Sequence, residues 1–147
     1  ILFLGCGLVH NEKITGPYRL IAVDVSSQMS ICYELGGGDA IGRINETVFA
    51  YGQNERYIVA KQHPNGNIGI TNYFYLDMTK DTKYADPSES VSGPLIEKEF
   101  DKVAKELNLP DFNRTLKRLE WMLTKNACES SYFGSTPFRR CMKNEKM

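Results

Sequence analysis

His63 is the residue of this sequence best placed for proton transfer. It lies beside Lys61 at the end of a predicted strand, just before Pro64, and Asp77 ends a nearby predicted strand. An imidazole oriented by a carboxylate could act as a general base. His63, Lys61 and Asp77 therefore form a candidate polar site. We favour the alternative, a histidine that hydrogen-bonds a turn, because no G-x-S-x-G motif supplies a nucleophilic serine.

Patterns that could bind a metal ion or a cofactor are weaker. His10 and His63 are the only histidines, and Cys128 and Cys141 are too far apart to form a C-x-x-C pair. The glycines at 36–38 lack the following helix and the lysine of a nucleotide-binding loop, so they predict a hairpin turn. We expect neither a metal ion nor a cofactor.

A different chemistry is indicated at the start of the chain, by Phe3-Leu4-Gly5-Cys6. In bacterial lipoprotein signals an apolar stretch ends in a small residue followed by cysteine, which receives a lipid. Gly5 and Cys6 fit this pattern, Phe3 fits loosely, and Leu4 is larger than usual. The alternative is a buried first strand with Cys6 as a core thiol. We favour a lipid on Cys6, which would attach the protein to the membrane of a bacterial cell envelope, facing the periplasm or the exterior.

Polar residues soon after Cys6 are what a membrane tether requires. They are Asn11, Glu12 and Lys13. The sequence therefore predicts an export remnant and tether over residues 1–17 and a single α+β domain over residues 18–147.

The remaining cysteines are consistent with an oxidising compartment. Cys128 and Cys141 flank a loop in a tail without an apolar period. A disulfide between them would contribute about 3 kcal/mol by loop-entropy reasoning. Cys32 lies within a predicted strand and is left as a buried thiol.

Length and composition predict one ordinary folded domain. The chain has 147 residues, of which 41% are hydrophobic and 24% are charged. A chain of this length can bury roughly two thirds of its unfolded surface. Lys+Arg and Asp+Glu both number 18, so no overall positive field attracts nucleic acid, and we expect no such partner. No run approaches the roughly 18 apolar residues that span a bilayer.

Alternating polar and apolar residues predict an antiparallel sheet between residues 18 and 77. Within 29–35 every second residue is apolar, so these side chains share one face of a strand. Turns at 36–39 and 64–67 are short, whereas parallel strands need long crossovers. The pattern favours an up-and-down meander of about five strands.

C-terminal to this sheet the apolar residues take a helical spacing. Pro94 suits the first turn of a helix, and Phe100, Val103 and Leu107 then recur at three and four positions as one apolar stripe. A second helix is expected over 112–123. The predicted fold class is α+β, an antiparallel β-meander with one or two C-terminal helices packed on one face.

Three runs of the chain carry a family resemblance. In order, they are IGRINETVFAYGQNERYIVAKQHP, ITNYFYLD and SGPLIEKEFDKVAKEL. With these runs the chain resembles a family of short bacterial proteins of unknown function, many of them predicted lipoproteins. The resemblance implies a compact sheet with a packed helix and an exported, often lipid-anchored, protein. It implies no activity.

We therefore expect an exported lipoprotein with a non-catalytic binding or structural role at the cell envelope. Two alternatives stay open: a small envelope hydrolase that uses His63 and Asp77, and a subunit whose sheet face or edge pairs with a partner protein. A cleft holding His63 and Asp77 within hydrogen-bond distance would favour the hydrolase. A large exposed apolar patch would favour the subunit.

Overall fold

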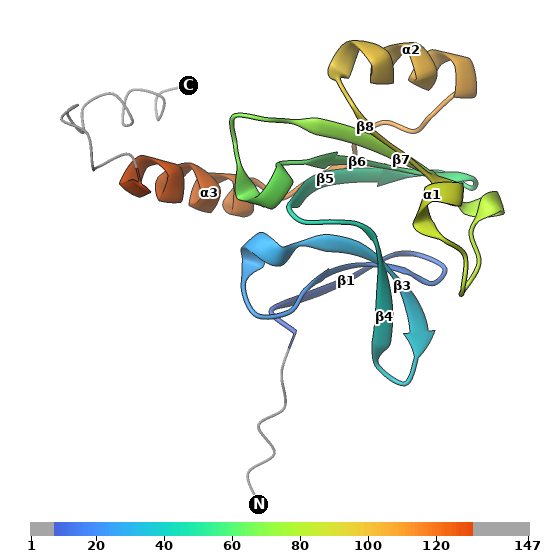
Figure 1. Cartoon of the computed structure of the whole chain (residues 1–147), viewed down its shortest axis with the longest axis horizontal. Helices are drawn as coiled ribbons and strands as arrows, with labels where there is room; N and C mark the ends of the chain where they lie inside the picture. Colours follow the sequence, from blue (N-terminus) through green and yellow to red (C-terminus); the bar gives the residue numbers. More distant parts are fainter. Residues whose placement is uncertain (1–7, 131–147) are drawn as a thin grey trace, which may run out of the picture.

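The computed structural model describes residues 8–130, with side chains to residue 127. Two antiparallel sheets lie one above the other in Figure 1, with helix α2 (Glu97–Leu107) over the outer face of the second sheet and α3 (Lys117–Ser130) at one end. The predicted α+β class is confirmed. Among the described residues, no helix is long and apolar enough to cross a membrane.

The first sheet contains four strands in sequence order, each antiparallel to the next. They are β1 (His10–Thr15), β2 (Tyr18–Ala22), β3 (Ser30–Gly36) and β4 (Asp39–Ile44). A short 3-10 helix, η1 (Ser26–Gln28), connects β2 to β3.

Strand β1 lies in the segment that the sequence suggested as a tether. Asn11 and Lys13 pair with Ile21 and Arg19 of β2. The first sheet therefore includes residues N-terminal to the domain boundary expected at residue 18. The polar sequence of β1 resembles a tether because β1 is an edge strand whose outward side chains meet water.

The second sheet contains five strands in the order β8-β7-β6-β5-β9. They are β5 (Val48–Gln53), β6 (Tyr57–Gln62), β7 (Asn72–Asp77), β8 (Val91–Leu95) and β9 (Arg114–Thr115). Short helices interrupt the connections: η2 (Pro64–Gly66), η3 (Met78–Lys80) and α1 (Pro87–Ser90). Strand β9 returns from the C-terminal part of the chain and pairs with β5.

The strands divide into two sheets because the chain leaves the first sheet after Ile44. Thr47 exchanges two backbone hydrogen bonds of 2.9 Å with His63, which places the next strand in the second sheet. Each sheet then buries one apolar face against the other. The fully or almost fully buried side chains of this core are Leu20, Ile31, Ile44, Val48, Ile58 and Leu76.

Helix α2 begins at Glu97, three residues after the start predicted at Pro94. Residues 91–95 instead form β8, an edge strand paired with β7. A residue before proline is pushed to extended angles, and an edge strand tolerates proline because one side makes no ladder bonds. These preferences outweigh the helix-start signal of Pro94.

Phe100 joins α2 to the outer face of the second sheet. Its ring centroid lies 5.2 Å from that of Tyr73 and 5.4 Å from that of Phe112. Val59 of β6 belongs to the same cluster and is fully buried. Leu107 is 38% exposed, so only the first part of the predicted apolar stripe covers the sheet.

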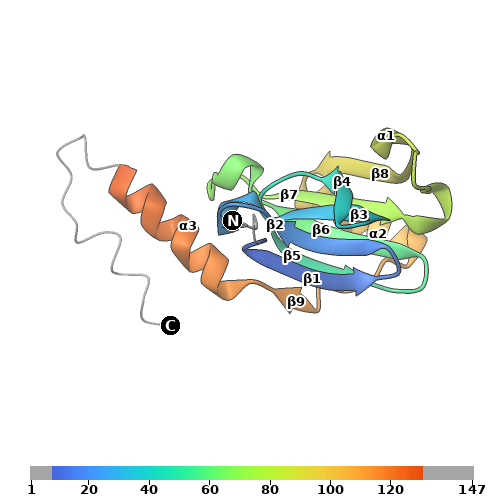
Figure 2. The same ribbon diagram turned by 90° about the horizontal axis from the view of Figure 1, so that it is seen from below.

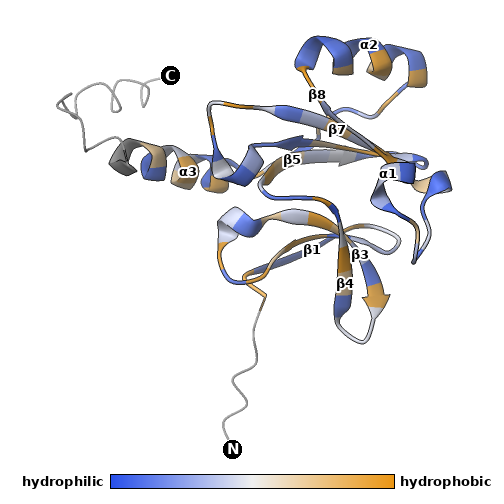
Figure 3. Cartoon of the chain, in the orientation of Figure 1, coloured by the Kyte–Doolittle hydropathy of each residue, from blue (hydrophilic) through white to orange (hydrophobic). Residues whose placement is uncertain are grey.

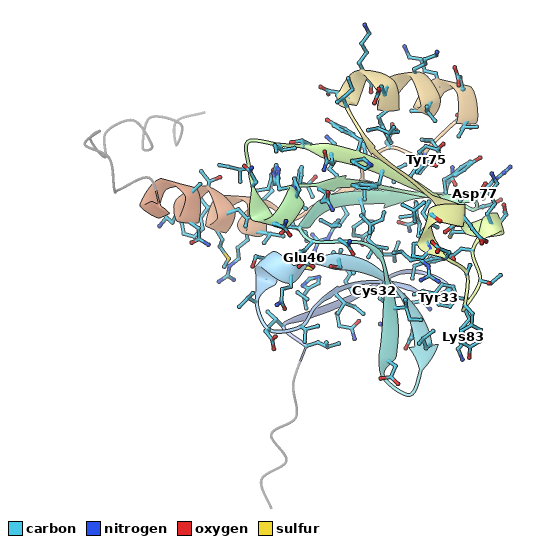
Figure 4. The ribbon with its side chains drawn as sticks, viewed as in Figure 1. Cys32, Tyr33, Glu46, Tyr75, Asp77 and Lys83 are labelled. Atoms are coloured by element: carbon cyan, nitrogen blue, oxygen red, sulfur yellow. The ribbon has the colours of Figure 1, made fainter. Side chains whose placement is uncertain are left out.

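A buried ion pair connects the segment after β7 to the first sheet. Arg43 Nε donates to Asp81 Oδ2 at 2.8 Å, and both side chains are fully buried. Tyr18 donates its hydroxyl to the same oxygen at 2.8 Å, and burial together with this bond raises the pKa of Tyr18. In Figure 4 this segment, marked by Lys83, descends beside the strands marked by Tyr33. It fixes one sheet against the other.

Candidate functional site

The structure separates the residues of the predicted polar site. His63 follows the last residue of β6, whereas Asp77 lies opposite Tyr57 at the other end of the β6–β7 hairpin. The six positions from 57 to 63 correspond to about 20 Å of strand, so His63 and Asp77 cannot share a hydrogen bond. Lys61 lies elsewhere again, with Nζ 4.7 Å from the ring centroid of Phe112.

His63 has a structural environment. Its side chain is buried, and its ring stacks on Phe49 with centroids 4.0 Å apart. Nδ1 lies 2.9 Å from the carbonyl oxygen of Ile70, which requires a proton on Nδ1. Nε2 lies 3.6 Å from Glu120 Oε1 of α3. His63 therefore connects the 64–70 turn and helix α3 to the second sheet.

Asp77 caps the helix that follows its strand. It accepts hydrogen bonds from Arg56 at 2.9 Å and from the backbone N–H of Thr79 at 3.1 Å. The Arg56 bond above all, with those from Thr79, lowers the pKa of Asp77 to about 2 although burial opposes the shift. Figure 4 shows Asp77 where β7 ends. Both carboxylate oxygens of Asp77 therefore already accept hydrogen bonds from nearby residues.

The predicted lipid-anchor and disulfide residues fall outside what the structure describes. Cys6 and Cys141 are not in the described range, nor is the side chain of Cys128. Cys32 on β3 is described, and burial raises the pKa of its thiol to about 11, which makes it unreactive at neutral pH. Among the described residues, no three His, Cys, Asp or Glu side chains gather as metal ligands would.

A groove between the first sheet and helix α3 is the candidate functional site. We name it the β1–α3 groove; its volume is about 790 Å³, within the range of small-molecule sites. Its walls come from the start of β1, from η1 with Met29, from β9 and from the first two turns of α3. Figure 2 shows β1, β9 and α3 next to one another on this side of the molecule.

The floor of the groove is apolar. Met29, Leu116 and Leu119 line it and are buried in the main core. Val9 and Met122 also line it but are 49% and 37% exposed. Figure 3 colours parts of α3 and the segment that leads into β1 orange, as hydrophobic. A ligand with an apolar chain would bury apolar surface of its own and of the groove when it binds there.

The rim of the groove is basic. Arg114, Lys117 and Arg118 all line it. Arg114 Nε donates to Glu12 Oε1 at 3.1 Å, and His10 Nε2 lies 3.2 Å from Glu12 Oε2. Burial alone would raise the pKa of Glu12, but these contacts to His10 and Arg114 hold it below its usual value, so this carboxylate is ionised and already paired.

Two of the basic side chains are free to meet a ligand. Within the described part of the chain, neither Lys117 nor Arg118 forms an ion pair. Ser26 and His10 both line the groove, but His10 bonds Glu12, and no hydrogen bond joins it to Ser26 among the described residues. The geometry supports binding of an acid with an apolar chain better than it supports nucleophilic catalysis.

Sequence reasoning did not find this groove. Its residues come from segments 9–10, 26–29 and 114–122, which only the fold brings together. A local signal is visible in hindsight: RTLKRL places three basic residues around two apolar ones.

Comparisons with known proteins give one match. The model of a family described as "Protein of unknown function (DUF3997)" matches residues 15–120. This range runs from the last residue of β1 into the first turn of α3. No curated protein and no solved structure matches the chain.

Proposed function

The chain belongs to the DUF3997 family, whose function is unknown, and we propose that it is an exported bacterial lipoprotein with a non-catalytic binding role at the cell envelope. Its anchor is a lipid on Cys6, and its ligand is an acidic amphiphile. The observation that carries the binding role is the β1–α3 groove, with its apolar floor and basic rim.

The charges of the groove select the sign of the ligand. Glu12 is paired with Arg114 and His10, which leaves Lys117 and Arg118 to attract an acidic head group. The buried floor of Met29 and Leu119 suits a hydrocarbon chain. A fatty acid has both features, and oleate is a suitable probe.

Reversing the two free charges tests the ligand class. Lys117→Glu combined with Arg118→Glu is expected to weaken oleate binding at least about tenfold, because about 1 kcal/mol is at stake for each charge near the surface. Isothermal titration calorimetry below the micelle concentration measures the change. Lys102→Glu with Lys105→Glu on α2 is the matched control and should leave the affinity unchanged. Equal affinities of the two double variants would rule out the acidic ligand.

The cysteine pattern supports the proposed compartment. Gly5-Cys6 follows an apolar run, as in lipoprotein signals. We further propose a disulfide between Cys128 and Cys141, which an oxidising envelope compartment would permit.

Removing the acceptor thiol tests the anchor. Cys6→Ser is expected to move the protein from the membrane fraction to the soluble fraction of bacterial cells, because serine has no sulfur to form the thioether bond to the lipid. Immunoblotting of the two fractions measures the shift. Cys32→Ser, which removes the thiol on β3, should leave the protein in the membrane fraction. A wild-type protein that is itself soluble would contradict the proposal.

The hydrolase alternative based on His63 and Asp77 has no support in the geometry. The two side chains lie at opposite ends of one hairpin. Each is committed to its own turn by hydrogen bonds.

A further inference from the structure

Four exposed apolar residues gather where the chain enters the first sheet. Leu8, Val9, Val23 and Val25 are 43%, 49%, 46% and 52% exposed. The backbone N–H of Val9 donates to the carbonyl oxygen of Val23 at 3.3 Å, which brings the two segments together. Figure 3 shows the apolar colour at this entry point. We name these four residues the entry patch.

The entry patch lies within a very short length of chain from Cys6. Leu8 is two positions after Cys6, which is at most about 7 Å of extended chain. Strand β1 begins at His10, so only about 14 Å of chain could lie between Cys6 and the sheet. If Cys6 carries the anchor of the proposed function, no tether is long enough to hold the domain away from the bilayer.

Charges beside the entry patch fit an anionic lipid surface. Val9 also lines the β1–α3 groove, whose rim carries Arg114, Lys117 and Arg118. Each basic residue near a membrane surface contributes favourably with anionic lipids. Asp24 lies between Val23 and Val25 and is the acidic residue of that loop. Arg114 is already paired with Glu12, and the two free basic residues, Lys117 and Arg118, outnumber Asp24.

We propose that the entry patch rests on the lipid bilayer, so that the anchored domain has one orientation and the β1–α3 groove opens at the membrane surface. This inference rests on the proposed lipid anchor. Valine and leucine side chains then enter the boundary between headgroups and acyl chains. An acidic lipid could pass from the bilayer into the groove without crossing water.

Fluorescence quenching by brominated lipids tests this orientation. The lipidated full-length protein is reconstituted into vesicles of phosphatidylglycerol and phosphatidylcholine, with and without bromine on the acyl chains. Trp121 is the only tryptophan, so Trp121→Phe supplies a dark background. One variant adds Val25→Trp in the entry patch. The matched control adds Ile96→Trp, at a 61% exposed residue just before α2 on the outer face of the second sheet.

The expected result is that bromine reduces the emission of the Val25→Trp variant about twofold, because the ring reaches the acyl boundary, and leaves the Ile96→Trp variant unchanged. Thermal unfolding of both variants confirms that they are folded. Vesicle-bound protein with equal emission loss, or none, at both positions overturns the orientation and leaves the patch to a protein partner. Wild-type protein that carries no lipid and stays in the supernatant overturns the proposed anchor and this inference with it.

Discussion

Asp81→Asn is expected to lower the free energy of unfolding by about 3–5 kcal/mol, because it leaves the Arg43 charge buried without a counterion. Glu34→Gln should cost less than about 1 kcal/mol. Each change removes the carboxylate that pairs with an arginine of the first sheet. The Nε–oxygen distance is 2.8 Å in both ion pairs. The pairs differ in burial: Arg19 and Glu34 are 27% and 38% exposed. Urea denaturation measures both changes.

The contacts of Asp81 explain the size of the effect. Its Oδ2 accepts from both Arg43 and Tyr18, and Arg43 also donates to the carbonyl oxygen of Thr82 at 3.0 Å. Oδ1 of Asp81 is buried and has no hydrogen-bond partner among the described residues. Among the described residues Arg43 forms no ion pair with a second carboxylate that could replace Asp81.

A double variant separates the charge from the packing. Replacing both partners, as Arg43→Met with Asp81→Leu, should restore much of the stability that Asp81→Asn removes, because no buried charge then remains. If Asp81→Asn and Glu34→Gln lower the free energy of unfolding equally, the Arg43–Asp81 pair is solvated and does not stabilise the packing of the two sheets. If the double variant is as unstable as Asp81→Asn, packing rather than charge is responsible.

Local patterns were sufficient to predict the class of the fold but not its division into two sheets. Alternation of apolar residues predicted strands, and the 36–39 turn joins β3 to β4 as expected. The division depends on which face each strand buries, and the consecutive residues 48–52 of β5 and 57–60 of β6 are buried on both faces. Periodicity alone therefore could not assign these strands to separate layers.

Gly52 shows how a residue can be visible in a sequence while its reason is not. A Cβ atom at this position would collide with the backbone carbonyl of Asp111. The close approach lets the chain after α2 reach β5, where β9 pairs with it. Strand β9 has only two residues, too few for any pattern, so this part of the groove wall could not be predicted.

The β1–α3 groove could not be predicted from the sequence, whereas the separation of His63 from Asp77 could have been. The groove joins segments more than 80 positions apart, and no local signal reports such a contact. The pairing of His63 with Asp77 was avoidable, because consecutive antiparallel strands run in opposite directions. The last residues of two such strands therefore lie at opposite ends of the strand pair.

Phe100→Ala is expected to lower the free energy of unfolding by about 3–5 kcal/mol, a large share of the roughly 5–15 kcal/mol that stabilises a domain. Phe100 is 4% exposed and packs against Tyr73, Phe112 and the fully buried Val59. The truncation leaves a cavity that the rings of Tyr73 and Phe112 and the side chain of Val59 cannot fill. Thermal and urea denaturation measure the loss.

Two substitutions on the same helix make this result specific to packing. Lys105→Ala removes an exposed side chain and should change stability by less than about 0.5 kcal/mol. Leu107→Ala removes a side chain that is 38% exposed, so its effect should lie between the other two. Because α2 covers the outer face of the second sheet (Figure 1), folded Phe100→Ala protein should bind oleate as the wild type does. Equal stability of the Phe100 and Lys105 variants would mean that α2 does not pack on the sheet, and would move α2 from the core to the candidate binding surfaces.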